Sequence, residues 1–174
     1  MAESNMTKRA LASAMKQLMS RYPFAKINVG DICDLCGMNR KSFYYHFRDK
    51  YDLVNWIFQT EFISLFQDTV ARDYWQIMEL LCSYLYENRA FYRNALSIQG
   101  QNAFSEYFQA CITPIIRAAL QSSMSTNDSD SQFVADFFSD ALVVSIVRWL
   151  SSRDILEPQV YTRQLRLCFG SINP

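Results

Sequence analysis

Glycine and proline are scarce in this sequence, and histidine occurs once. The 174 residues include 4 Gly and 4 Pro, whereas β-sandwiches, barrels and Rossmann domains need more turn residues, so the composition favours helices. The glycines never cluster, which excludes a glycine-rich phosphate-binding loop. A His-based metal site or a Ser/His/Asp triad would have to use His46 alone. These shortages disfavour an enzyme, and we expect neither a cofactor nor a metal.

Long apolar runs and a secretory leader are also missing from the sequence. The first residues do not contain a basic segment followed by an apolar one. The most apolar stretch, 141–150, is interrupted by Arg148 and is too short to cross a membrane. The 5 cysteines are scattered and odd in number, which is typical of free thiols in a reducing compartment. We therefore expect a cytoplasmic protein without a membrane span.

Charge is distributed unevenly, although the formal net charge is zero. Residues 1–50 contain 9 Lys and Arg against 4 Asp and Glu, and every lysine of the sequence lies there. Residues 51–174 contain 8 basic against 13 acidic side chains. Such asymmetry is typical of a polyanion-binding module at the N-terminus of a neutral-to-acidic body.

Half of the residues are apolar, and their spacing predicts an all-α fold. Leu11, Ala14, Met15 and Leu18, for example, follow helical spacing. Helices are expected over 6–20, 29–36, 40–46, 50–69, 75–95, 101–121, 133–150 and 158–170, with a polar loop over 121–131. Pro114 is expected to kink the helix that contains it.

Capping residues predict a helix-turn-helix between residues 29 and 46. Asn28 and Asn39 are expected to be N-caps of the two short helices, and Gly37 is placed to end the first of them. A glycine-containing turn of about three residues then separates the helices, as in helix-turn-helix motifs. Asp49 is expected to cap the long helix that follows.

The stretch INVGDICDLCGMNRKSFYYHFRDKYDL, residues 27–53, resembles the DNA-binding motif of the TetR family of transcriptional regulators. The family pattern is an Ile-Thr-Val start, an Ile-Ala pair, Ala-Gly-Val, Thr-Phe-Tyr, His-Phe, Lys and Leu. The sequence matches it without insertion and departs from it at Asn28, Cys33, Cys36, Met38 and Ser42. Residues 86–108, YENRAFYRNALSIQGQNAFSEYF, are similar to a subgroup that includes regulators of dihydroxyacetone-kinase operons.

The resemblance implies two domains: an N-terminal three-helix helix-turn-helix DNA-binding domain over 1–49, and a C-terminal helical ligand-binding and dimerisation domain over 50–174. The second short helix would be the recognition helix, whose N-terminal half docks in a major groove. Arg40 can form a bidentate pair with guanine O6 and N7. The residues predicted to bind DNA are Asn28, Asn39, Arg40, Lys41, Ser42, Tyr44, Tyr45, His46 and Lys50.

Several residues of this motif have two interpretations. Tyr45 is compatible with a DNA contact or with a packed aromatic, and His46 with a DNA contact or a hydrogen-bonded structural role. Lys50 and the free N–H groups at the start of its helix can together hold a phosphate. Phe43 and Phe47 are expected in the core rather than stacked on bases.

Cys33 and Cys36 form a C-x-x-C pair within the first short helix. Zinc would need a second pair of ligands, and a thioredoxin-like redox motif would need a strand-to-helix context. The sequence provides neither. We expect both cysteines to be small core residues, at positions where the family has alanine.

The resemblance also implies an apolar effector cavity and a dimer interface in the C-terminal domain. Candidate lining residues, each of which could instead be core, are Phe62, Phe66, Phe104, Tyr107, Phe108 and Phe138. The helix 133–150 carries two apolar stripes, one beginning at Phe133 and one at Val134. One stripe can face the core and the other is expected at an interface, unless the helix is buried on both sides. Candidate dimer residues are Phe133, Phe137, Ala141, Val144, Arg148 and Leu167.

The sequence thus predicts a DNA-binding transcriptional regulator, a repressor like most of the family. It would bind a palindromic operator as a homodimer and respond to an unknown small-molecule or protein effector. The alternatives are a helical protein-interaction module that has lost specific DNA binding, or a co-regulator-dependent activator without a small-molecule ligand. An enzyme is disfavoured because the sequence offers no nucleophile–base pair or carboxylate cluster.

Overall fold

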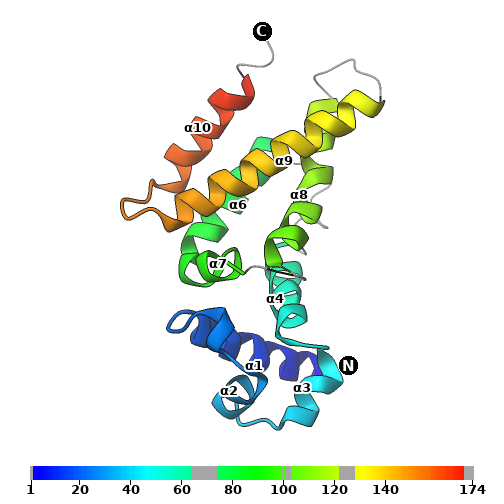
Figure 1. Ribbon diagram of the computed structural model, residues 1–174, viewed down its shortest axis with the longest axis vertical. Coiled ribbons are helices and arrows are strands. Elements are labelled where there is room, and N and C mark those ends of the chain that lie inside the picture. The colour runs from blue at the N-terminus through cyan, green and yellow to red at the C-terminus, as the bar shows by residue number, and fades with distance from the viewer. Residues whose placement is uncertain (1, 64–73, 99, 101–102, 122–127, 171–174) are drawn as a thin grey trace. The chain divides into compact units, whose positions relative to one another are not determined.

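A computed structural model describes residues 2–63, 74–98, 100, 103–121 and 128–170, and every regular element in these ranges is a helix (Figure 1). The expected all-α class is therefore confirmed. The elements are α1 Ala2–Met19, the 3-10 helix η1 Phe24–Lys26, α2 Val29–Leu35, α3 Arg40–His46, α4 Lys50–Phe58, the π-helix η2 Gln59–Ile63, α6 Tyr74–Glu87, α7 Arg89–Ala95, α8 Phe104–Gln121, α9 Asp128–Ser151 and α10 Pro158–Gly170.

The chain divides into two compact units. The first consists of Met1–Leu65 and Ala90–Phe104, and the second of Phe66–Arg89 and Ser105–Pro174. The first unit therefore extends past residue 49, because α4 and nearly all of α7 pack with the N-terminal helices. The expected division between residues 49 and 50 stays a prediction about independently folding domains.

Side-chain caps define the helices of the first unit where the sequence predicts them. Oδ1 of Asn28 accepts from Asp31 N at 3.1 Å, and Oδ2 of Asp31 accepts from Asn28 N at 2.8 Å, which forms a capping box at the start of α2. Gly37 adopts φ +67° after α2, a left-handed conformation that glycine tolerates without strain. Oδ1 of Asn39 accepts from Ser42 N at 2.8 Å and caps α3.

Two helical segments differ in detail from expectation. The helix expected over 50–69 continues beyond Phe58 as a π-helix to Ile63, and residues 64–69 lie outside the described part of the chain. The helix expected over 75–95 is interrupted at Asn88, between α6 and α7. Lys16 Nζ forms an ion pair with Glu61 Oε2 at 2.6 Å, which ties the π-helix to α1.

The polar loop predicted over 121–131 extends too far toward the C-terminus. Residues 128–131 already belong to α9, and residues 122–127 lie outside the described ranges. Asp130 lies exposed in the first turn of α9, where the helix dipole favours negative charge. α8 continues through Pro114.

In the second unit, the C-terminal end of α9 contacts α10 and Arg89. Trp149 is 5% exposed and stacks on Tyr161 of α10, with ring centroids 4.2 Å apart and planes 6° from parallel. Arg89 donates to the carbonyls of Leu150 and Ser152, and so satisfies acceptors at the C-terminal end of α9. Among the described helices, none is both long enough and apolar enough to span a bilayer.

Candidate nucleic-acid interface

The recognition helix α3 is held by two buried aromatic rings. Phe43 and Phe47 are buried, with centroids 5.8 Å apart, and Phe47 also packs against Trp56 of α4. Their expected core role is confirmed. Because this face of α3 is fixed in the core, the opposite face is directed to solvent.

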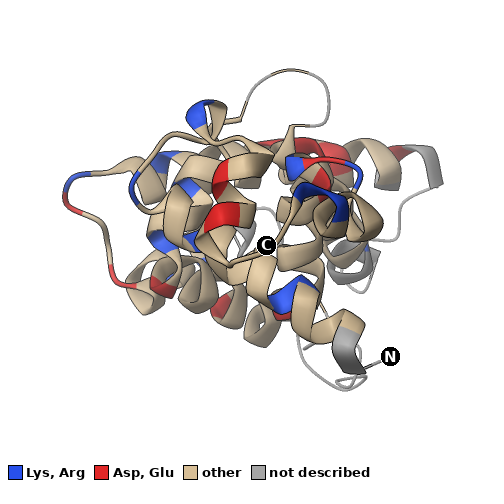
Figure 2. Ribbon diagram, turned by 90° about the horizontal axis from the view of Figure 1, so that it is seen from below, with Lys and Arg blue, Asp and Glu red and all other residues tan. Residues whose placement is uncertain are grey.

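The solvent face of α3 presents the side chains predicted to bind DNA. Arg40 and Lys41 are exposed, and Tyr44 and Tyr45 are 58% and 82% exposed. Tyr45 is therefore not a packed core aromatic. Figure 2 marks the Lys and Arg positions of the ribbon in blue and the Asp and Glu positions in red. Two cations and two phenols within two turns of α3 provide the donor set that phosphates and base edges accept.

Asn28, Asn39 and Ser42 take part in the two caps already described. The side-chain oxygens of both asparagines accept from the backbone, and Ser42 supplies its backbone N–H to Asn39. This arrangement leaves the asparagine amide NH₂ groups and the Ser42 hydroxyl as the side-chain donors for DNA. Asn28 and Asn39 therefore cap α2 and α3, and Ser42 lies in the first turn of α3. The DNA contacts of all three residues remain predictions.

His46 is half-buried at the end of α3, between two aromatic neighbours. Its ring lies 4.9 Å from that of Tyr45 and 6.4 Å from that of Phe47, measured between centroids. These contacts support the structural interpretation of His46 in part. Its contact with DNA remains a prediction.

Lys50 lies differently from the expected phosphate clamp. Its ammonium donates to the carbonyls of Phe24 at 2.8 Å and Ile27 at 2.7 Å, and lies 4.2 Å from the centroid of the Phe24 ring. Partial burial lowers the pKa of the ammonium, and the nearby Asp31 carboxylate opposes this effect. The Phe24 carbonyl begins η1 and also accepts from Ile27 N, whereas the Ile27 carbonyl directly follows η1. A phosphate contact by Lys50 remains a prediction that depends on its third N–H or on a change of rotamer.

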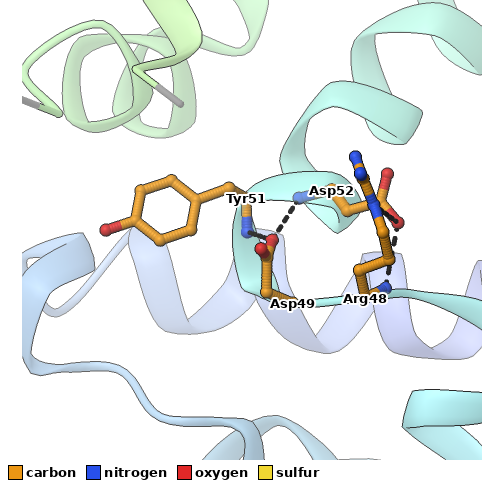
Figure 3. Close-up of polar contacts among 4 residues, drawn as sticks. All are labelled: Arg48, Asp49, Tyr51 and Asp52. Carbon is orange, nitrogen blue, oxygen red and sulfur yellow. Dashed lines mark hydrogen bonds and ion pairs between the residues drawn. The ribbon is translucent and has the colours of Figure 1, made fainter. Parts of the chain in front are cut away.

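The backbone N–H groups at the start of α4 are also less available to bind a phosphate than expected (Figure 3). Oδ1 of Asp49 accepts from Tyr51 N at 2.9 Å and from Asp52 N at 2.8 Å, which confirms the expected cap. Asp52 Oδ2 in turn accepts from Arg48 N at 3.0 Å. Because two N–H groups of the first turn already bind a carboxylate, they are not free to hold a phosphate with Lys50.

The C-x-x-C pair lies in α2 and at its C-cap, and its expected core role is confirmed most clearly for Cys33. Cys33 is buried, and Cys36 is half-buried with its thiol donating to the carbonyls of Ile32 and Cys33. Burial is the main cause that raises the pKa of both thiols. Thiols of this kind are poor nucleophiles and metal ligands near neutral pH.

Residues predicted to line an effector cavity fall into both compact units. In the first unit, Phe62 stacks on Phe58 at 5.2 Å, and Phe104 packs against Phe58 at 5.6 Å and Tyr92 at 5.9 Å. In the second unit Phe108 is buried, whereas Tyr107 and Phe138 are half-buried. Burial, followed by the neighbouring Cys111, raises the pKa of the Tyr107 phenol. Phe66 lies outside the described residues. The effector role of these residues remains a prediction.

A hollow of about 440 Å³ lies elsewhere in the second unit, between α6 and α10. Five of its seven lining residues have polar side chains, and none of the seven is a predicted effector residue. The lining residues are Gln76, Glu79, Leu80, Ser83, Pro158, Gln159 and Thr162. Arg166 of α10 approaches Glu79 at 3.2 Å beside this hollow.

One face of α9 is exposed in the single chain. Phe133, Phe137 and Val144 are 72%, 59% and 56% exposed, and Leu167 of α10 is 67% exposed. The other two candidate dimer residues, Ala141 and Arg148, are exposed as well. The second stripe supplies the buried side chains Leu142 and Trp149. The alternative that α9 is buried on both sides within one chain is therefore wrong.

Two family models match this chain and together extend over both of its units. The family "Bacterial regulatory proteins, tetR family" matches residues 7–57, and "Transcriptional regulator C-terminal region" matches residues 73–168. The chain belongs to the TetR family of transcriptional regulators. The first match spans α2 and α3, so the TetR DNA-binding domain coincides with the exposed basic helix described above.

Several relatives of this TetR-family chain are characterised by name or structure. The chain is 34% identical over 109 residues to the HTH-type dhaKLM operon transcriptional activator DhaS of Lactococcus lactis subsp. lactis (strain IL1403). This match covers 62% of the chain and 57% of that relative, so it spans little more than half of the relative's length. A solved structure of a dihydroxyacetone kinase operon activator DhaS superposes with a TM-score of 0.70 at 25% identity, covering 95% of this chain and 96% of that one.

Two more distant structures share the fold alone. A TetR transcriptional regulator from Streptococcus agalactiae 2603V gives a TM-score of 0.74 at 19% identity, covering 97% of this chain and 95% of that one. NalD, the secondary repressor of the MexAB-OprM multidrug efflux pump in Pseudomonas aeruginosa, gives 0.69 at 13% identity, covering 98% and 97%.

Sequence analysis did not single out two residues that position this interface. Gly30, in the first turn of α2, lies beneath the side chain of Arg40. Asn94, in α7, binds the connection between α1 and η1. A glycine inside a helix is a visible signal, but no local pattern marks Asn94, because its partners lie more than sixty residues earlier in the sequence.

Proposed function

We propose that this TetR-family chain binds double-stranded DNA by placing α3 in a major groove. The main support is that α3 has a buried face and an exposed face. Phe43 and, directly after the helix, Phe47 are buried. The exposed face carries Arg40, Lys41 and Tyr44. A rigidly seated helix with cations at its N-terminal end is the geometry by which helix-turn-helix proteins contact base edges. Arg40 reads a guanine, while Lys41 and Tyr44 contact phosphates or groove edges.

The proposed regulator acts as a homodimer. Support comes from the exposed apolar stripe of α9, together with Leu167 of α10, because contiguous apolar surface of this kind is usually covered by a partner. A two-fold dimer presents two copies of α3 and so matches a palindromic operator. Its half-sites lie about one helical turn, ~34–36 Å, apart.

We assign activation as the sign of regulation, in place of the repression expected from the family at large. The similarity to DhaS, which is named as an activator of the dhaKLM operon, supports this choice. Repression is the alternative. A chromosomal deletion and complementation experiment distinguishes them, because transcripts beside the bound sites fall on deletion of an activator and rise on deletion of a repressor.

The proposed effector binds the second compact unit and changes DNA affinity by favouring one of two conformations. In that unit Phe108 is buried, and the hollow between α6 and α10 has polar side chains at five of its seven lining residues, which favours a protein effector over an apolar small molecule. Co-purification of a partner protein, with no thermal shift from an apolar ligand library, is the expected result. A small molecule that raises the melting temperature and displaces DNA would contradict it.

Salt dependence tests the DNA-binding proposal against a protein-interaction module. The logarithm of the DNA affinity is expected to fall with the logarithm of the salt concentration with a slope near −0.9 for each phosphate contacted, and about six contacts per dimer are expected. The measurement compares a selected site with bulk DNA, and Lys41→Ala is the matched variant. An affinity no higher for the selected site than for bulk DNA would favour the interaction module.

A further inference from the structure

Gly30 lies directly beneath the guanidinium of Arg40. It is the second residue of α2 and is buried, although Asn28, two residues earlier, is exposed. A Cβ atom at this position would lie 2.6 Å from Nη2 of Arg40, 3.3 Å from its Cζ and 2.8 Å from Oδ1 of Asn28. Real Cβ atoms do not approach other heavy atoms within 3.0 Å. The guanidinium can therefore occupy this place only because residue 30 has no side chain.

The Arg40 side chain reaches from the first residue of α3 to the first turn of α2. Besides its approach to Gly30, its positive charge acts on the Cys33 thiol one turn later, where it opposes the rise in pKa that burial causes. Nη2 and Cζ of Arg40 thus lie over the first turn of α2, although the residue as a whole is exposed. This placement is a feature of this chain's own residues, since it depends on a glycine in the first turn of α2.

We propose that Gly30 is a specificity-determining residue: its missing side chain fixes where the Arg40 guanidinium lies, and hence which base pair of each half-site Arg40 selects. The inference rests on the proposed function, because Arg40 must bind DNA for its orientation to matter. Bidentate recognition of guanine requires the planar fork to be aligned with O6 and N7. A seated guanidinium meets this requirement with less loss of rotamer freedom than a freely moving one.

The substitution Gly30→Ala separates orientation from folding. The added methyl group meets the flexible end of Arg40 and the Asn28 side chain, both of which can move. Alanine also favours the helix relative to glycine. We therefore expect a folded protein in which the guanidinium is displaced. Gly30→Ser adds the same Cβ atom, but serine has a lower helix propensity than alanine. An effect that both variants share is therefore caused by the Cβ atom.

The experiment selects bound fragments from a random DNA pool with four chains: wild type, Gly30→Ala, Arg40→Ala and Gly30→Ala/Arg40→Ala. Gly30→Ala is expected to change base preference by about 5-fold or more at the same position that Arg40→Ala affects. The double variant is expected to match Arg40→Ala. An unaltered base preference in Gly30→Ala would overturn the inference. The inference would also be overturned if Gly30→Ala changed the base preference equally in the Arg40→Ala background. If wild type enriches nothing, the proposed function fails, and this inference with it.

A second measurement needs no glycine variant. In the free wild-type protein, NMR relaxation of the Arg40 Nε–H group is expected to give an order parameter near that of rigid backbone, about 0.85. Arg21, which is exposed, is the matched control, with an expected value below about 0.6. Equal mobility of the two guanidinium groups would show that Gly30 does not seat Arg40.

Discussion

Asn94 of α7 binds Phe24 of η1 across 70 residues of sequence, with its Oδ1 accepting from Phe24 N at 2.9 Å. The same side chain donates through Nδ2 to the carbonyls of Met19 at 3.0 Å and Tyr22 at 2.6 Å. One amide thus satisfies three backbone groups in the connection between α1 and η1. Lys50 donates to the carbonyls of Phe24, at the start of η1, and Ile27, directly after it. The connection that precedes α2 is therefore fixed from two helices.

Asn94→Ala is expected to lower the free energy of unfolding by about 1–3 kcal/mol, because it leaves part-buried backbone groups without partners. Chemical denaturation measures the loss. Asn88→Ala is the matched control, because Asn88 donates one bond only, from Nδ2 to Tyr84 O, among the contacts described for it. The same loss in both variants would mean that the three bonds of Asn94 have no special weight.

Arg40→Ala and Lys41→Ala are expected to have different effects on DNA binding. Loss of Arg40 should cost ~1–3 kcal/mol at one base position and relax the preference there, because a bidentate guanine contact disappears. Loss of Lys41 should weaken binding to all sequences and reduce the salt slope by about one. Titrations of matched and single-mismatch operators at several salt concentrations separate the two effects. If Arg40→Ala kept the full sequence specificity, Arg40 would not be the residue that contacts the base.

Phe137→Glu is expected to produce a folded monomer. Phe137 is exposed on α9, so the charge remains solvated in the single chain but would be desolvated at an interface. Sedimentation equilibrium and the melting temperature provide the two readouts. Leu142→Glu, on the buried face of the same helix, is the control and should instead unfold the second unit. A Phe137→Glu dimer of unchanged affinity would place the interface elsewhere.

Trp149→Arg is expected to destabilise the second unit rather than only the dimer. Trp149 is buried, stacks on Tyr161 and donates from Nε1 to the Leu156 carbonyl at 2.9 Å. The substitution removes these contacts and buries a charge, which should cost at least ~3–5 kcal/mol. Thermal unfolding measures it, with Trp149→Phe as the milder control. An unchanged melting temperature would show that this stack is peripheral.

The sequence predicts the local features of the DNA-binding unit well. Asn28, Gly37, Asn39 and Asp49 cap or end their helices as expected, because capping depends on residues within one turn. The burial of Phe43 and Phe47 follows from their spacing in the same way. The polar stretch before α9 is harder to predict, because aspartates and serines suit a loop and the first turn of a helix equally.

Contacts between distant segments are what the sequence does not reveal. The position of Lys50 suggests a phosphate contact, yet its ammonium binds carbonyls more than 20 residues earlier. The π-helix after Phe58 likewise has no local pattern that distinguishes it from a continuing α-helix. The orientation of Arg40 depends on a glycine in another helix, which becomes visible only when α2 and α3 are packed together.

In the proposed complex, α3 reads a palindromic operator through Arg40 and Tyr44. Selection of bound fragments from genomic DNA, with wild type beside Arg40→Ala/Tyr44→Ala, measures whether it does. Both side chains are exposed, so the double variant should fold, and its melting temperature serves as the control. We predict that wild type enriches a palindrome and that the folded double variant loses it. Enrichment of the same palindrome by both proteins, or of none by wild type, would contradict the account.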